Sequence, residues 1–167
     1  MLFEQSKLEE KLGKEITLYF HQNRKWEFHF KVAKKISYAE FLTNKMLIIA
    51  AIREGIPFSM FNLIQHYTPF TENDWANFLD ISTKSLQRYR QESAFSFKSL
   101  HSEKIIEMAE VTKKGMDVFE EMDKLKLWLN TPNYALGNIK PIELLKDSYG
   151  KDLVLGELMR INHGILS

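Results

Sequence analysis

The sequence predicts a mainly α-helical protein in which a helix-turn-helix domain is followed by a small helical domain. Apolar residues recur every three to four positions over most of the chain after residue 37. The 7 glycines and 4 prolines leave room for short turns only. Residues 75–90 have the spacing of two helices joined by a tight turn. We therefore expect three parts: an N-terminal extension (1–36), the helix-turn-helix domain (37–100) and a C-terminal domain (101–167).

Composition excludes several classes of protein. The 23 basic and 22 acidic residues give a net charge of +1, which argues against nonspecific coating of nucleic acid but leaves room for a local basic patch. Without cysteine there is no disulfide framework and no thiolate metal site. The longest apolar run, residues 46–52, is too short for a membrane span of roughly 20 residues. The N-terminus lacks the apolar stretch of a signal peptide, so we expect a cytoplasmic protein that does not bind membranes.

An enzyme is the weakest of the possible function classes. The sequence has no glycine-rich phosphate loop, no nucleophile motif and no pair of carboxylates at catalytic spacing. Four of the histidines have no metal-ligand spacing, namely His21, His29, His66 and His101. We accordingly predict no catalytic residue, no metal site and no cofactor.

The N-terminal extension combines a helical pattern with an alternating one. Residues 1–14 fit one short amphipathic helix. Residues 26–32 then alternate between apolar and polar side chains, which is typical of a half-buried strand. With Leu18 and Phe20 before a turn at residues 22–24, the pattern predicts a short β-hairpin. A lone hairpin is marginally stable, so it should pack on the helices or on a second subunit.

Glycine and proline mark several expected helix boundaries. Gly55 and Pro57 should end a helix over residues 45–54. Pro141 suits the first turn of a later helix, and Gly150 fits the end of that helix. The last helix should bury an apolar face, which we expect to comprise Leu153, Val154, Leu158, Met159 and Ile161.

The helix-turn-helix is expected between Thr71 and Gln91. Thr71 is a suitable N-cap for the first helix, and Ser82 for the second. Ala76 is small where the two helices cross. The turn commonly has glycine where this chain has Asp80, and aspartate tolerates the left-handed backbone conformation better than most residues.

The second helix of such a motif enters the major groove of DNA. Its outward-facing residues are our candidates for contacts to base edges and phosphates. They are Ser82, Thr83, Lys84, Gln87, Arg88 and Gln91. The alternative interpretation is a solvated polar face without a partner.

The C-terminal region resembles the toxin-binding domain of the Xre/MbcA/ParS antitoxin family. The motifs that carry the resemblance occur in the family's order, and they are Trp128-Leu129, Pro132-Asn133, Ala135-Leu136-Gly137, Pro141 to Leu145, Gly150, Arg160-Ile161 and His163-Gly164. Upstream, residues 53–57 and 81–88 look like the family's Xre-type helix-turn-helix domain. The chain departs from the family at Asn138, often glycine, and at Asn162, often an acid. The resemblance covers about residues 45–167.

The resemblance implies an antitoxin whose partner is a RES-domain toxin. Such toxins have a fold related to ADP-ribosyltransferases and consume NAD or transfer from it. The antitoxin's C-terminal end lies close to the toxin's cleft, and the helix-turn-helix domain represses the shared operon by binding operator DNA. The implied toxin-binding residues are Pro132, Asn133, Leu136, Gly137, Arg160, His163 and Gly164.

The candidate toxin-binding residues can also be explained without a binding partner, and a second function for the protein stays open. Cations such as Arg160 near a helix C-terminus favour the helix dipole without any partner. Pro132, Asn133 and Gly137 can simply shape a loop. The alternative function is a one-component transcription regulator whose C-terminal module senses a small ligand, which would require a ligand pocket there.

We predict that the chain forms a homodimer through its helix-turn-helix half, and a hetero-oligomer with its toxin. Operators for such motifs are usually two-fold symmetric, and the helix over residues 45–54 is apolar on several sides. Light scattering at micromolar concentration measures the assembly directly. A strict monomer, both alone and with toxin, contradicts this prediction.

Overall fold

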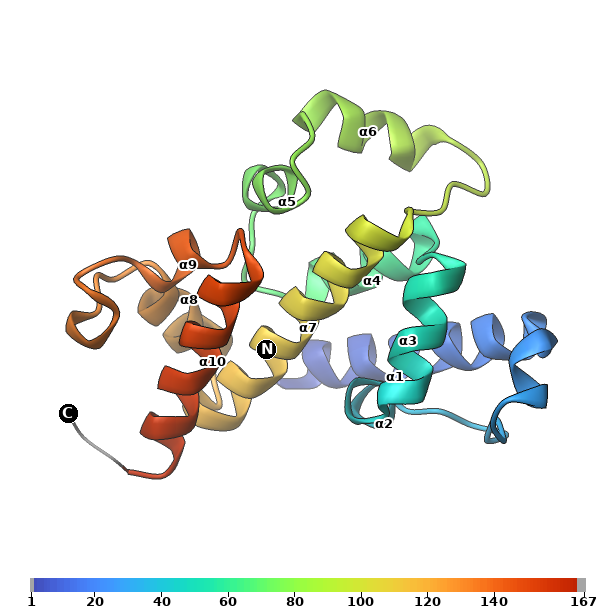
Figure 1. The fold of residues 1–167 in the computed structure, drawn as a ribbon, viewed down its shortest axis with the longest axis horizontal. Helices are drawn as coiled ribbons and strands as arrows, with labels where there is room; N and C mark the ends of the chain where they lie inside the picture. The colour runs from blue at the N-terminus through green and yellow to red at the C-terminus, as the bar shows by residue number, and fades with distance from the viewer. Residues whose placement is uncertain (1, 165–167) are drawn as a thin grey trace. The chain divides into compact units, whose positions relative to one another are not determined.

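The computed structural model describes residues 2–164, and its regular elements are helices (Figure 1). In chain order they are α1 (Leu2–Gln22), the 3-10 helix η1 (Arg24–Phe28), α2 (Tyr38–Thr43), α3 (Lys45–Glu54), α4 (Phe58–Tyr67), α5 (Glu72–Phe78), α6 (Thr83–Gln91), α7 (Ser99–Phe119), α8 (Met122–Leu129), the 3-10 helix η2 (Tyr134–Leu136), α9 (Pro141–Leu144) and α10 (Ser148–Asn162). Isolated β-bridges join Pro57 to Ser96 and Asn133 to Ile139. The predicted mainly α fold class is confirmed.

The chain forms two compact units. One contains Met1–Tyr67 and Gln87–Ile106, and the other contains Thr68–Leu86 and Glu107–Ser167. Helices α6 and α7 therefore contribute residues to both units. The functional division at residues 36 and 100 stays a prediction. Within residues 2–164, no helix has the length and hydropathy needed to cross a membrane.

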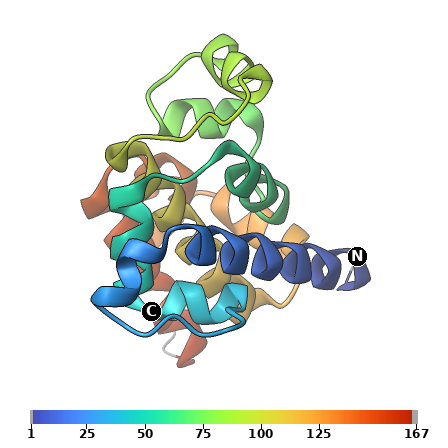
Figure 2. The same ribbon diagram turned by 90° about the vertical axis from the view of Figure 1, so that its right-hand side faces the viewer.

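The first unit is organised around α1, which packs against α2 and α4 (Figure 2, α1 in blue). Leu12, Ile16 and Phe20 recur every four residues and are completely buried. Near this core, the Tyr67 hydroxyl donates a hydrogen bond to the Glu9 carboxylate. Burial raises the pKa of the Tyr38 hydroxyl far above its ordinary value, so Tyr38 stays neutral. These polar groups belong to the packing of the unit.

The predicted β-hairpin is wrong. Leu18 and Phe20 lie inside α1, which continues to Gln22 instead of ending near residue 14. Trp26 lies in η1, and its carbonyl accepts hydrogen bonds from the backbone N–H groups of His29 and Phe30. The Trp26 and Phe30 rings are also neighbours, with centroids 6.4 Å apart. The apolar residues that alternate in the sequence therefore also satisfy the i, i+4 spacing of a helical turn.

Several predicted helix boundaries are confirmed. Gly55 caps α3 with a φ of 94°, and a Cβ atom there would approach the Phe97 carbonyl oxygen to 2.5 Å. Pro141 is in the first turn of α9. Gly150, in contrast, does not end the preceding helix: α9 stops at Leu144, and Gly150 is in the first turn of α10.

The second unit depends on close packing between α9 and α10. The Asp147 carboxylate caps α10 by accepting a hydrogen bond from the Gly150 N–H at 2.7 Å. A Cβ atom at Gly150 would lie 1.8 Å from the Leu144 carbonyl oxygen. Val154 and Leu158 follow Gly150 on the same face of α10 and are completely buried. Gly150 is therefore required by the approach of two backbones.

We predict that Gly150→Ala lowers the free energy of unfolding by about 1–3 kcal/mol. Helix propensity alone favours alanine over glycine by roughly 1 kcal/mol, so the steric overlap must reverse the sign. Urea unfolding followed by circular dichroism measures the change. Gly156→Ala in the same helix is the matched control, because a Cβ atom there meets nothing within 4 Å. Equal stability of Gly150→Ala and the natural chain contradicts the inferred packing.

Candidate functional site

Helices α5 and α6 form the predicted helix-turn-helix. Thr71 and Asp74 make a reciprocal capping box at the start of α5. Asp80 has a φ of 53°, which is the left-handed conformation expected at the turn. After this turn the backbone stays bound to α5, because the Ile81 N–H donates a hydrogen bond to the Ala76 carbonyl at 3.0 Å. Ala76 is buried, which confirms its expected position in the crossing of the helices.

The core of the motif is close to the expectation. Trp75 and Leu86 are completely buried and Leu79 nearly so, whereas Ile81 is half-buried. Tyr89 is also half-buried, and its ring stacks on Phe95 with centroids 4.0 Å apart.

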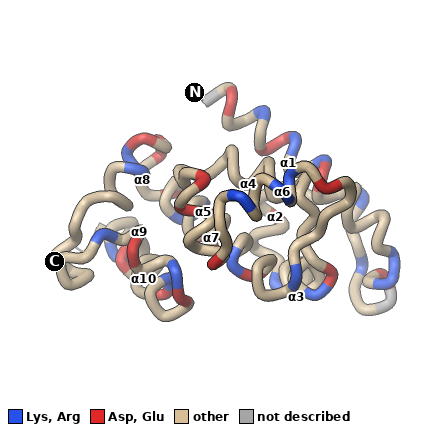
Figure 3. Tube along the Cα trace, turned by 90° about the horizontal axis from the view of Figure 1, so that it is seen from above, with Lys and Arg blue, Asp and Glu red and all other residues tan. Residues whose placement is uncertain are grey.

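The candidate DNA-contacting residues divide into a capped end and an exposed face of α6. The Ser82 hydroxyl accepts a hydrogen bond from the Ser85 N–H at 3.0 Å, so Ser82 caps α6 as predicted. Thr83 is half-buried. The other four candidates are exposed and recur at helical spacing, and they are Lys84, Gln87, Arg88 and Gln91. Figure 3 shows basic residues on α6.

Arg88 has a local partner. Its Nε lies 3.6 Å from Oε1 of Glu92, one helical turn later, and both side chains are substantially exposed. An exposed ion pair of this kind contributes little stability. A phosphate or a base edge can therefore replace Glu92 at small cost.

The candidate partner-binding residues fall into two groups in the second unit. The first group is a closed loop, in which the Asn133 N–H donates to the Ile139 carbonyl and the Asn138 N–H donates to the Asn133 carbonyl. Gly137 has a φ of 74° and Asn138 a φ of 61°, so the loop turns through two left-handed residues. Pro132 and Gly137 are exposed, and Leu136 is half-buried. The loop therefore has a defined backbone conformation and is accessible from solvent.

The second group is the C-terminal end of α10. Arg160 is half-buried, whereas His163 and Gly164 are exposed. His163 caps the helix, and Gly164 has a φ of 69°. The two groups lie on adjoining elements, because η2 packs against α10.

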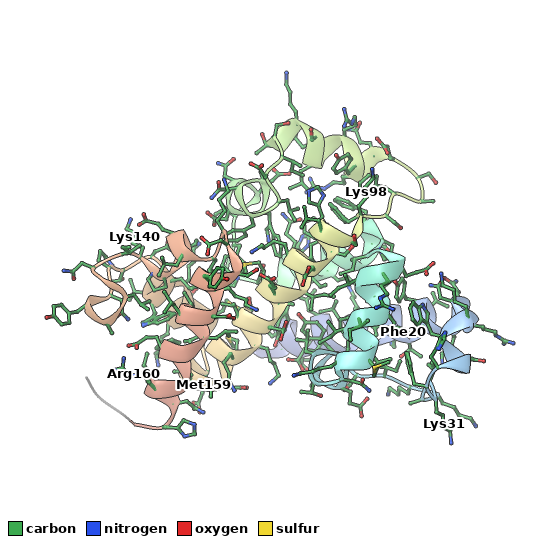
Figure 4. All side chains as sticks on the ribbon, in the orientation of Figure 1. Phe20, Lys31, Lys98, Lys140, Met159 and Arg160 are labelled. Atoms are coloured by element: carbon green, nitrogen blue, oxygen red, sulfur yellow. The ribbon has the colours of Figure 1, made fainter. Side chains whose placement is uncertain are left out.

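Arg160 also has a structural role that the sequence analysis missed. Its Nη1 donates to Oε2 of Glu157 at 2.8 Å, and the Glu157 carboxylate is buried. A buried carboxylate needs such a partner to offset the loss of its hydration. The i, i+3 spacing of Glu157 and Arg160 was the available sequence signal. Figure 4 shows where Arg160 and Met159 lie on α10.

Exposed apolar residues are the other feature that the sequence analysis missed. Tyr149 is 88% exposed and Leu153 58% exposed on α10, and Tyr134 in η2 is 86% exposed. The prediction that Leu153 and Met159 lie in the core is wrong, since Met159 is also 46% exposed. Leu153 and Met159 have the helical spacing of core residues. However, apolar side chains occupy a wider part of the α10 surface than the part that packs in the core. Such surface is typical of a partner-binding protein.

The described residues thus combine a helix-turn-helix with a helical module that has exposed apolar side chains. Residues 114–164 match the model of the antitoxin Xre/MbcA/ParS C-terminal toxin-binding domain. The resemblance predicted from the sequence is thereby confirmed for this domain. Its matched range includes both groups of candidate partner-binding residues.

Two known proteins are similar to larger parts of the chain. The protein named Antitoxin Xre from Photorhabdus laumondii subsp. laumondii is 29% identical over 119 residues, which are 71% of this chain and 80% of that protein. A chain in the crystal structure of the M. tuberculosis MbcT–MbcA toxin–antitoxin complex is 23% identical, with a TM-score of 0.47. That match covers 59% of this chain and 86% of the other.

The described residues offer no obvious place for a metal. Within residues 2–164, no group of three or more histidine, aspartate or glutamate side chains is arranged to hold a metal ion. The candidate sites consist instead of polar, basic and apolar side chains, most of them exposed, on α6, on α10 and in the loop over residues 132–138. This chemistry is suited to binding macromolecules.

Proposed function

We propose that this protein is the antitoxin of a type II toxin–antitoxin system. It binds and neutralises a RES-type toxin that consumes NAD or transfers ADP-ribose, and it represses its own operon by binding DNA. The observation that carries the proposal is the match of residues 114–164 to a toxin-binding domain, combined with the exposed loop and helix end within that range. The Photorhabdus protein named Antitoxin Xre supports it over a longer part of the chain.

In this proposal, the C-terminal end occludes the toxin's NAD cleft. Support comes from the end of α10, where the left-handed Gly164 lets the chain leave the helix direction. His163 is exposed beside it. Arg160 supplies a planar fork of donors for carboxylates or carbonyl oxygens. Residues 165–167, which complete this segment, lie outside the described residues.

Deleting residues 163–167 should separate neutralisation from folding. His163 is exposed and Asn162 already ends α10, so the described residues lose no core packing. We expect a folded truncated protein that keeps any DNA binding but loses much of its protection of cells that co-express the toxin. Circular dichroism of the purified protein checks the fold. Full protection by a folded truncation places neutralisation on residues 125–158 instead.

Arg160→Ala should give a milder loss of protection, but it also leaves the buried Glu157 carboxylate without its partner. The double variant Glu157→Gln with Arg160→Ala removes that complication. If Arg160 acts on the toxin, the double variant should remain impaired in protection. Recovery of full protection would assign Arg160 a structural role alone.

The DNA-binding part of the proposal rests on α6. Its exposed face contains lysine, arginine and glutamine, which suit phosphates and base edges. The proposed dimer would present two such helices to a two-fold operator. Met46 and Ile49 on α3 are 47% and 38% exposed, which supports the helix over residues 45–54 as the dimer contact.

Arg88→Ala should weaken binding to the promoter DNA of the chain's own operon by about 1–3 kcal/mol if Arg88 contacts a base edge. Lys84→Ala should reduce the slope of log K against log salt by about one unit if Lys84 contacts a phosphate. Fluorescence anisotropy over a salt series measures both. Arg24→Ala, at an exposed arginine in η1 away from α6 and from the proposed dimer contact, is the matched control. Unchanged DNA binding in both α6 variants, with protection intact, indicates a motif that serves dimerisation only.

A further inference from the structure

Helix α10 and its C-cap carry a continuous surface stripe, in which every member but the half-buried Arg160 is exposed. Its members are separated by four, three, four and three residues, which places them on one side of an α-helix. They are Tyr149, Leu153, Gly156, Arg160 and His163. Tyr149 and Leu153 are among the exposed large apolar residues of the chain. From the rise per residue, the stripe extends about 21 Å along the helix.

Within residues 2–164, nothing explains Gly156, which lies at the middle of this stripe. Glycine in a helix interior is destabilising relative to alanine, so a specific reason for it is expected. A Cβ atom at Gly115 would overlap the Leu125 side chain, and one at Gly150 would overlap the Leu144 carbonyl. A Cβ atom at Gly156 meets nothing within 4 Å. Gly156 also has no left-handed φ that would require glycine.

Close approach of another molecule to the helix would account for a glycine at this position. A residue without a side chain, flanked along the stripe by the exposed Leu153 and the half-buried Arg160, leaves a shallow saddle on the helix surface. An apolar side chain or a helix of another protein can approach the α10 backbone closely there. Tyrosine and arginine are also enriched among the residues that contribute most to protein–protein affinity.

We infer that the Tyr149–Leu153–Gly156 stripe is the principal docking surface for the toxin, with an apolar ridge of the toxin seated over Gly156. This inference rests on the proposed function and adds to it an apolar surface that precedes the C-terminal end along α10. Two observations favour the toxin over a second copy of this chain. The whole stripe lies within the matched toxin-binding domain. It also continues through Arg160 to His163, where the proposed cleft-blocking segment leaves the helix.

The probe is the purified protein encoded by the reading frame adjacent to this chain's gene, and biolayer interferometry measures its Kd for the full-length chain. Tyr149→Ala and Leu153→Ala should each weaken binding at least about tenfold. The control Leu100→Ala removes a leucine that is 76% exposed on α7, outside the domain, and should change Kd less than about twofold.

Gly156 provides the sharper test because stability and binding should change in opposite directions. Gly156→Ala and Gly156→Leu should leave the Tm unchanged or raise it by about 2–4 °C, since both residues favour a helix. Gly156→Leu should nevertheless weaken toxin binding at least about tenfold, because its side chain fills the saddle. A merely structural glycine would lose stability on substitution.

The outcomes distinguish this inference from the proposed function. If the natural chain does not bind the adjacent-frame protein, the antitoxin function fails and the stripe fails with it. If the natural chain binds and Tyr149→Ala, Leu153→Ala and Gly156→Leu bind equally well, the stripe is overturned while the antitoxin function stands. If Gly156→Leu instead dissociates a dimer of this chain and leaves toxin binding unchanged, the stripe is a self-association surface and the inference is overturned.

Discussion

The close approach of Gly150 to the Leu144 carbonyl is the contact on which the candidate partner-binding surface depends. It sets the first turn of α10 against α9, while the Asp147 cap fixes the residue at which the helix begins. One face of α10, which contains Gly150, Val154 and Leu158, packs in the core. This packing determines the rotation of the helix about its axis. The remaining faces are then directed to solvent, and the exposed stripe follows from that rotation.

The two glycines of α10 consequently have opposite surroundings. Gly150 is needed because another backbone occupies the space of its missing side chain, whereas the space beside Gly156 is empty. Sequence alone does not distinguish them, because both interrupt the same helical pattern. The structure distinguishes them by what a Cβ atom at each position would touch. A helix that tolerates a costly residue on its open face indicates a constraint imposed by something that binds there.

Local chemistry made parts of this structure predictable from the sequence. Asp80 adopts the left-handed turn, Ser82 caps α6, and Gly55 ends α3, because each depends on residues a few positions away. The errors arose where two periodicities fit the same residues. Trp26 and Phe30 fit both a strand and a helical turn, and tertiary packing of the extended α1 favoured the turn. The exposed apolar residues of α10 were missed because periodicity identifies an apolar face without saying how much of it the core covers.

The Glu157–Arg160 pair connects this internal architecture to the proposed interaction. Glu157 is buried on the core side of α10, and its carboxylate holds the Arg160 guanidinium in one position. An arginine fixed in this way loses less conformational entropy on binding than a free surface arginine. Along α10, Arg160 lies between the apolar part of the stripe and the exposed His163 at the helix end. The Glu157 carboxylate thus preorganises Arg160 at the polar end of the stripe. In the proposed complex, the apolar residues of the stripe supply affinity and Arg160 fixes the orientation of the partner.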